Sequence, residues 1–464
     1  MADVVKTLKP SGGDYTSLIT WEATEQADLV TATDTHTLEC YTGDYTAVGG
    51  GVNYVDEGAS IVVAGWTTNA TYNLTIKTPT AEQHDGRLKS SGVYTGFTIA
   101  FSFNGIALNA AGQNYCDIIG LAIDHTGAGA GSGCLQHGGT GSYIEKNIAN
   151  NPIAIGIEAY PNTGETIYLS NNLATNCGSW GFRVGYRANL YCYNNTAIDC
   201  DTGFSFRDNN AGSNIVVKNC FADNSGTADF ARDSTNGTFS VDYSASSDTT
   251  ANTWGGTGNR ISQTFTYEDS ANDDFRITSS DAGAREYGTS LSADANYPIS
   301  DDIIGTSRPQ GSNWDIGFFE VAAGVTATLT GTATASITES DIVTGGKTII
   351  LTLTGDTFIT GTTSEDGIAA GSDSAQAEAN GWDAVVKADL DNTNVVLSGG
   401  DTIATITLPA YATYDITAQE TITWTIPAAS LTTSSSPIVA TPTFTIDQVS
   451  VGNGLLLLNQ ANSL

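Results

Sequence analysis

Six residues in the middle of the chain combine side-chain types that bind and cut carbohydrates. Aromatic rings stack on sugar faces, while guanidinium and carboxylate groups bond to hydroxyls or uronates. A carboxylate and a base on one strip could also serve a polysaccharide hydrolase or lyase as acid and base. The same side chains could instead form surface ion pairs and a tyrosine ridge without a ligand. The six residues are Glu158, Tyr160, Arg183, Tyr186, Arg207 and Asp208.

A sequence repeat positions these residues. The segments SNNLATNCGSWGF (170–182) and YNNTAIDCDTGFSF (193–206) share an Asn-Asn pair and a Gly-Phe pair. Two columns of markers extend the repeat in both directions, at intervals that drift together. The first column is Ala122, Ala149, Ala174, Ala197 and Ala222, and the second is Gly133-Cys134, Gly156-Ile157, Gly181-Phe182, Gly203-Phe204 and Asp229-Phe230.

The repeat predicts a parallel β-helix. Short alternating strands in units of ~20–30 residues, without a helical period, are typical of one coil of such a fold. Like residues then stack on successive coils, so Asn147, Asn172 and Asn195 should form a ladder of side-chain amides. Cys177 and Cys200 fall in register. The residues expected in an inward apolar column are Cys134, Ile157, Phe182, Phe204 and Phe230.

The chain resembles right-handed parallel β-helix proteins of phage virions, the tailspike, fibre and decoration proteins. SGGDYTSLITWEA (11–23) resembles their N-terminal cap, in which Tyr15, Leu18 and Trp21 would cover the first coil. The segments 273–288 and 301–320 resemble their closing segment, in which Arg308 would tie the acids together through bidentate bonds and cap the last coil. Its markers are Asp302, Gly305, Arg308, Asp315, Gly317 and Glu320.

The composition changes near residue 322, where Thr, Ala and Ser become dominant. Alternating runs at 347–358, 402–410, 420–428 and 441–447 predict a β-sandwich, and the stretch 364–386 predicts a short helix that ends near Trp382. This part resembles immunoglobulin-like modules of phage structural proteins. We therefore expect an all-β chain with a β-helix over 1–323, a β-sandwich over 324–448 and an apolar tail over 449–464.

The apolar tail contains four consecutive leucines, Leu455, Leu456, Leu457 and Leu458. They would either close the sandwich or dock into a partner subunit or a larger assembly.

Charge and cysteine content exclude several classes of function. The chain has 17 basic and 50 acidic residues and a formal charge of −33, which opposes binding to nucleic acid. We expect no cofactor, although calcium stays open; DLDNTN (389–394) reads as an Asx-rich turn or a calcium loop. The seven cysteines form neither a zinc pattern nor an even disulfide set, so buried thiols are expected and no metal site. No stretch is long enough to span a membrane.

The sequence leaves three functions open. The first is a non-enzymatic virion protein that contacts other virion proteins and host glycans, assembled in the host cytoplasm. The second is a tailspike-like polysaccharide depolymerase or lyase, for which the nearby carboxylates are few. The third is a secreted bacterial adhesin. The start, MADVVKTLKP, has no apolar h-region, so we expect either a removed leader or assembly in the cytosol. The resemblance also implies a homo-oligomer, in many spikes a trimer.

Overall fold

The computed structural model describes most of the chain. The described residues are 2–126, 133–151, 153–161, 164–186, 189–208, 212–234, 236–322, 328–333, 337–354, 357–376, 378–431, 438–441 and 444–448. The chain divides into two compact units, Met1–Ala322 and Ala323–Leu464. Each unit has its own hydrophobic core, so each is described by itself.

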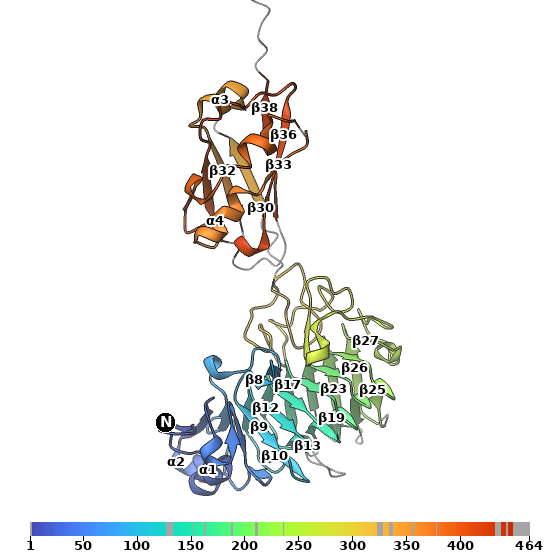
Figure 1. Ribbon diagram of the computed structural model, residues 1–464. Coiled ribbons are helices and arrows are strands. Elements are labelled where there is room, and N and C mark those ends of the chain that lie inside the picture. The colour runs from blue at the N-terminus through green and yellow to red at the C-terminus, as the bar shows by residue number, and fades with distance from the viewer. Residues whose placement is uncertain are drawn as a thin grey trace, which may run out of the picture. The chain divides into compact units, whose positions relative to one another are not determined.

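The first unit is a parallel β-solenoid with three sheets (Figure 1). Each coil adds one strand to sheet 1, then to sheet 2, then to sheet 3, and strands of successive coils pair in parallel. We call the equivalent position on the next coil the next rung. Sheet 1 contains β1 (Asp3–Leu8), β2 (Thr35–Cys40), β6 (Leu74–Lys77), β11 (Cys116–Ile119), β14 (Ser142–Glu145), β17 (Thr166–Ser170), β20 (Asn189–Tyr193), β23 (Asn214–Lys218) and β26 (Thr238–Asp242).

Sheets 2 and 3 complete each coil. Sheet 2 contains β3 (Gly50–Gly51), β4 (Tyr54–Asp56), β9 (Thr98–Phe101), β12 (Ala122–His125), β15 (Ile148–Asn150), β18 (Leu173–Thr175), β21 (Thr196–Ile198), β24 (Phe221–Asp223) and β27 (Ala245–Ser246). Sheet 3 contains β5 (Ile61–Val62), β10 (Ile106–Ala110), β13 (Gly133–His137), β16 (Ile155–Ala159), β19 (Trp180–Tyr186), β22 (Thr202–Asp208) and β25 (Ala228–Arg232).

The Asn-Asn pairs form the tight corner between sheets 1 and 2. The first asparagine of each pair has a left-handed backbone, with φ of 53° at Asn171 and 54° at Asn194. Asparagine tolerates this conformation better than most residues. The second asparagine joins the predicted ladder, which is confirmed: the Nδ2 of Asn147 donates to Asn172 Oδ1 at 3.0 Å, and that of Asn172 donates to Asn195 Oδ1 at 2.9 Å.

The interior columns match the prediction except at their N-terminal ends. Ala149, Ala174, Ala197 and Ala222 are in register, but the residue on the rung before Ala149 is Ile123, not Ala122. Likewise, Leu135 pairs with Ile157 in the apolar column that continues through Phe182, Phe204 and Phe230, so Cys134 was placed there wrongly. Both errors are shifts of one residue. All seven cysteines are buried and free, as expected.

Two different segments close the ends of the solenoid core. At the N-terminal end, α1 (Leu18–Glu25) buries Leu18 and Trp21 in the core, with Tyr15 packed against it, which confirms the predicted cap. The short α2 (Leu29–Ala32) follows. At the C-terminal end, the 3-10 helix η3 (Thr250–Asn252) buries Ala251. There the backbone at the free edge of the last strand of sheet 3 finds a hydrogen-bond partner, because Phe230 N–H donates to Thr250 Oγ1 at 2.9 Å.

The predicted closing segment lies along the side of the solenoid. Residues 260–321, which we call the return segment, pack on the outer faces of sheets 1 and 2. Gly317 N–H donates to the Asn219 carbonyl at 2.7 Å, and Phe318 N–H donates to Thr196 Oγ1 at 3.0 Å. The expectation that residues 273–288 and 301–320 cap the last coil is therefore wrong. η3 covers the end of the core, and Arg260 pairs with β27, the last strand of sheet 2.

Arg308 holds the return segment together, although not through the bidentate bonds expected. Its guanidinium donates to Glu320 Oε2 at 3.0 Å and to the carbonyls of Asp315 and Gly317 at 2.8 and 2.7 Å. Asp302 accepts N–H bonds from three residues, including Glu320 at 3.0 Å. Small elements outside the three sheets are η1 (Thr46–Val48), η2 (Thr80–Glu82), β7 (Lys89–Ser90), β8 (Val93–Tyr94), β28 (Tyr267–Asp269), η4 (Ser270–Asn272) and β29 (Asp274–Ile277).

The second unit consists mainly of antiparallel β-strands around a separate core that contains Trp382 and Trp424. In the described part, β30, β32, β35 and β34 pair antiparallel, as β36 does with β33, β37 and β38. Its elements are β30 (Thr328–Ala333), β31 (Ile337–Thr338), α3 (Glu339–Thr344), β32 (Thr348–Thr354), α4 (Thr362–Ala369), β33 (Ser372–Ser374), the π-helix η5 (Trp382–Val386), η6 (Asn392–Asn394), β34 (Val395–Ser398), β35 (Ile403–Thr407), β36 (Glu420–Ile426), η7 (Ala428–Ser430), β37 (Ile438–Thr441) and β38 (Phe444–Asp447).

The helix predicted within 364–386 is divided in two. α4 begins before this stretch, and η5 begins at Trp382, the residue at which the helix was expected to end. Between them, β33 pairs with β36. The indole N–H of Trp382 donates to Ser372 Oγ at 2.8 Å, which links η5 to β33.

Candidate functional site

The strands of sheet 3 bring most of the candidate carbohydrate-binding residues together. Side chains alternate between the core and solvent along β16, β19 and β22, so every second residue faces outward. Glu158 pairs in register with Arg183, and Gly185 pairs with Arg207 on the next rung. The Tyr160 N–H donates to the His137 carbonyl at 3.0 Å and thus continues β16 by one residue. We call this outward surface the sheet-3 strip.

Glu158 is the centre of the strip. Its Oε1 lies 3.5 Å from Arg183 Nη1 and 3.9 Å from Arg207 Nη1, and its Oε2 accepts a 2.9 Å bond from Gln136 Nε2. The arginine side chains are 27% and 20% exposed, against 12% for Glu158. Both contacts with Glu158 are longer than a charge-assisted hydrogen bond of ~2.7–2.9 Å. The two guanidinium groups therefore keep N–H donors for an incoming acceptor.

Aromatic rings flank both arginines. The Arg183 guanidinium lies 4.3 Å from the centre of the Trp180 ring, and that of Arg207 lies 5.0 Å from the centre of the Tyr186 ring. Burial, together with the charge of Glu158, raises the pKa of Tyr160. Tyr186 has a φ of 111°, which is unfavourable for a residue with a Cβ. Such strain is found disproportionately at functional sites.

Asp208 does not belong to the exposed strip. It is fully buried, and its carboxylate accepts bonds from Arg232, from Ser234 Oγ at 2.6 Å and from Gly237 N–H at 3.0 Å. These bonds lower its pKa against the opposing effect of burial. A carboxylate used in this way supports the local fold and offers no free face to a ligand.

The sequence reasoning missed three residues of the strip. Gln136 lies in register with Glu158, Trp180 lies beneath Arg183, and Asp233 Oδ2 lies 3.9 Å from Arg207 Nε. Gln136 was missed because the one-residue error at Cys134 sets Leu135, instead of Gln136, level with Glu158. Trp180 was missed because strict alternation back from Phe182 would turn it inward, whereas Gly181 and Phe182 both face the core and Trp180 is left outside.

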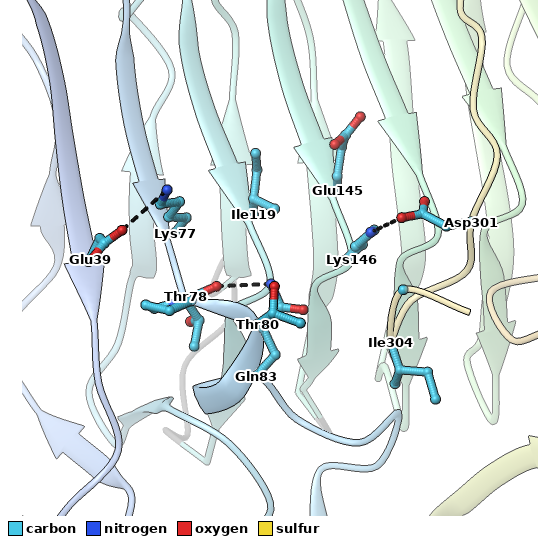
Figure 2. Close-up of a pocket in the computed structure, with 12 residues that line it drawn as sticks. Glu39, Lys77, Thr78, Thr80, Gln83, Ile119, Glu145, Lys146, Asp301 and Ile304 are labelled. Carbon is cyan, nitrogen blue, oxygen red and sulfur yellow. Dashed lines mark hydrogen bonds and ion pairs between the residues drawn. The ribbon is translucent and has the colours of Figure 1, made fainter. Parts of the chain in front are cut away.

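A separate cavity of about 540 Å³ lies on the outer face of sheet 1. Figure 2 shows Lys77, Ile119 and Glu145 projecting from neighbouring strands into this space. Facing residues come from η2 and its neighbours and from the return segment. The lining residues are Glu39, Lys77, Thr78, Pro79, Thr80, Gln83, Ile119, Glu145, Lys146, Asp301, Ile304 and Gly305.

The charged residues of the cavity are already paired with protein groups. Lys77 Nζ lies 3.3 Å from Glu39 Oε1, and Lys146 Nζ lies 2.5 Å from Asp301 Oδ2 (Figure 2). Glu145 accepts a hydrogen bond from the Tyr297 hydroxyl, and burial raises its pKa. The cavity thus has two positive and three negative side chains, and each lysine forms an ion pair with one of the carboxylates.

The remaining predictions concern metals, membranes and the tail. Among the described residues, no group of three or more His, Cys, Asp or Glu side chains is arranged to hold a metal ion. Within DLDNTN, Asp391 accepts the N–H of Thr393 at 2.8 Å and caps η6, as an Asx-turn does. None of the helices described is long and apolar enough to cross a membrane. Leu455, Leu456, Leu457 and Leu458 lie outside the described residues.

No model of a known protein family matches this chain, and no curated protein matches its sequence. The function of the chain is therefore inferred from its residues and their geometry.

Proposed function

We propose that this chain is a non-enzymatic structural protein of a phage virion, in which a β-solenoid displays a glycan-contacting strip. In this proposal, the second unit is an immunoglobulin-like module that attaches the protein to the particle or decorates it. The observation that carries the proposal is that the solenoid is capped at both ends and clasped along its side by the return segment. Such a unit is built for rigidity.

The polar groups of the solenoid support a structural role. The ladder from Asn147 to Asn195 satisfies the corners between sheets, and Arg308 and Asp302 are used inside the return segment. Asp208, which was predicted to lie on the strip, forms a buried ion pair with Arg232. Buried polar groups that are fully bonded in this way stabilise a fold and are unavailable for chemistry.

Glycan contact is proposed for the sheet-3 strip. Arg183 and Arg207 have N–H donors available for a ligand. Their guanidinium groups lie beside the rings of Trp180 and Tyr186. Such a combination is expected where a sugar hydroxyl or uronate binds. Substituting Arg183→Ala and Arg207→Ala together should abolish retention on immobilised host glycans. The matched control is Arg285→Ala, whose guanidinium donates to the Ser279 carbonyl in the return segment.

Mass spectrometry of purified particles tests the virion assignment. We expect peptides of both units in the particle fraction at a fixed ratio to the major capsid protein. Peptides found only in the culture medium of an uninfected bacterium would contradict the proposal and favour a secreted adhesin.

A polysaccharide depolymerase is the second candidate, and one observation favours it. Asp117 and Glu145 lie on neighbouring strands of sheet 1, where Glu145 lines the cavity, and burial raises the pKa of both carboxyl groups, to about 7 for Asp117. Raised pKa values suit a general acid. The assay is incubation with acidic and neutral polysaccharides, followed by reducing ends and unsaturated uronates. If the protein cleaves a polysaccharide and Glu145→Gln abolishes that cleavage, the chain is an enzyme and the non-enzymatic proposal is wrong.

A further inference from the structure

The cavity on sheet 1 exists because the return segment leaves part of the sheet uncovered. Glu39, Lys77, Ile119, Glu145 and Ser170 occupy one outward column on consecutive rungs. From Glu145 onward, Tyr297 covers this column, with its hydroxyl 2.7 Å from Ser170 Oγ. Before Glu145 the column is open. Ile119 is therefore a partly exposed apolar floor between two charged side chains.

The walls of the cavity are fixed by independent contacts. On one side, Gln83 Nε2 donates to the Thr78 carbonyl at 2.9 Å, which holds the loop that contains η2 (Figure 2). On the other side, Asp302 Oδ1 accepts the N–H groups of Ile304 and Thr306 at 3.0 and 2.7 Å, which fixes the turn at Gly305. Because the floor consists of paired strands, the cavity is preformed. A preformed site loses little conformational entropy when a ligand binds.

The charges of the cavity decide which ligands fit. Two lysines face three carboxylates, so a polyanion would meet a net negative site on a chain whose formal charge is −33. A small cation would find each carboxylate already bonded, to Lys77, Lys146 or Tyr297. What stays available is the second bonding capacity of these groups, together with the hydroxyl of Thr80 and the carboxamide oxygen of Gln83.

We propose that this cavity binds a neutral saccharide. One face of a sugar ring is apolar and would lie on Ile119, while its hydroxyls can donate to Glu145 and accept from Lys77. A volume of about 540 Å³ falls within the ~300–1,000 Å³ of ordinary ligand pockets. The site is on sheet 1 and shares no residue with the sheet-3 strip, so it does not depend on the glycan contact proposed there.

Binding of defined oligosaccharides to the full chain tests the proposal. The probes are maltotriose, cellotriose and chitotriose as neutral ligands and trigalacturonate as the anionic comparison, measured by saturation-transfer difference NMR and calorimetry. We expect at least one neutral trisaccharide to bind, and trigalacturonate to bind at least tenfold more weakly. Silence from all the neutral probes, or tighter binding of trigalacturonate, would overturn the proposal.

Two variants locate the binding site. Ile119→Arg places a long side chain on the cavity floor and should weaken binding at least tenfold, and Thr80→Ala, a milder change at the exposed rim, should weaken it two- to fivefold. The control is Ser240→Arg, which makes the same kind of change on β26 of sheet 1, far from the cavity. Binding that survives Ile119→Arg, or that is lost in Arg183→Ala, would assign the ligand to another surface and refute the cavity site.

Discussion

At the scale of single residues, the glycines of sheet 3 explain why the sequence repeats. Gly156, Gly181 and Gly203 follow one another on successive rungs; the first two each face an Ala and a Cys of the core, and Gly203 faces an Ala and a Ser. A Cβ at Gly181 would lie 2.8 Å from the Gly203 carbonyl oxygen and 3.0 Å from both Ala197 Cβ and Cys200 Sγ. The repeated Ala, Cys and Gly thus belong to a single packing unit that recurs in each coil.

This packing predicts the effect of a methyl group. Gly181→Ala should lower the free energy of unfolding by about 1–3 kcal/mol, because backbone and short side chains cannot move away. Gly133→Ala is the matched control, since its Cβ would lie 3.7 Å from its nearest neighbour, Ile106 Cγ1. Urea unfolding followed by circular dichroism measures both. Equal midpoints for the two variants would show that the Gly181 column is not close-packed.

Asp117 and His137 predict opposite pH effects on stability. Burial, with the charge of Glu145, raises the pKa of Asp117 to about 7, so between pH 5 and 6.5 the folded state retains a proton that the unfolded state has lost. Stability contributed by Asp117 therefore falls as pH rises. Burial lowers the pKa of His137 to about 4, against a hydrogen bond to the Cys116 carbonyl, so the unfolded state is the more protonated one and stability rises with pH.

Substitution should separate these effects. Asp117→Asn should make the slope of unfolding free energy against pH more positive, by up to about 1.4 kcal/mol per pH unit, and His137→Gln should make it more negative by a similar amount. Urea titrations at several pH values between 5 and 6.5 give the slopes. A common slope for both variants and the unmodified protein would contradict the assigned ionisation states.

At the scale of elements, the solenoid was predictable because stacked coils need the same type of residue at the same position in each coil. The Asn ladder needs one residue type at one corner, and the aromatic column from Phe182 to Phe230 needs large apolar residues at one inward position. The register error at Ala122 has a physical reason as well. Both faces of sheet 2 are buried, so the outward Ala122 and its inward neighbour Ile123 are equally apolar and alternation gives no signal.

The return segment could not be placed from sequence. Its contacts with the solenoid involve residues far apart in the chain, such as Gly317 with Asn219 and Tyr297 with Ser170. No repeat marks these pairs, and the sequence of the segment fits a cap on the last coil as well as a clasp on its side. The sheet-1 cavity was missed for the same reason, because the return segment forms one of its walls.

Arg308 should control whether the return segment stays closed. Arg308→Lys keeps the charge but cannot reach Glu320, Asp315 and Gly317 together, so the local stability of the segment should fall by about 3–5 kcal/mol. Hydrogen exchange should accelerate at the amides of Gly317 and Phe318 and stay slow at Thr196, inside the solenoid. Arg285→Lys in the same segment is the control. Equal protection in both variants would show that Arg308 is not the clasp.

At the scale of the whole molecule, the change in composition near residue 322 falls where the two units separate. The first unit buries Leu, Ile and Phe in files along the solenoid, whereas the second packs Trp382 and Trp424 between its own strands and short helices. The sequence predicted the strand content of the second unit better than its helices. The prediction of one helix ending at Trp382 was wrong because part of the stretch is the strand β33, which pairs with β36.

Because each unit has its own core, the two should unfold separately. Calorimetry of the full chain should show two transitions, and since unfolding enthalpy scales with chain length, the larger should carry roughly twice the enthalpy of the smaller. A fragment containing residues 1–322 should reproduce the larger transition at an unchanged midpoint, with far-ultraviolet circular dichroism typical of β-structure. A single cooperative transition, or a fragment that does not fold, would mean that the solenoid needs the second unit for its stability.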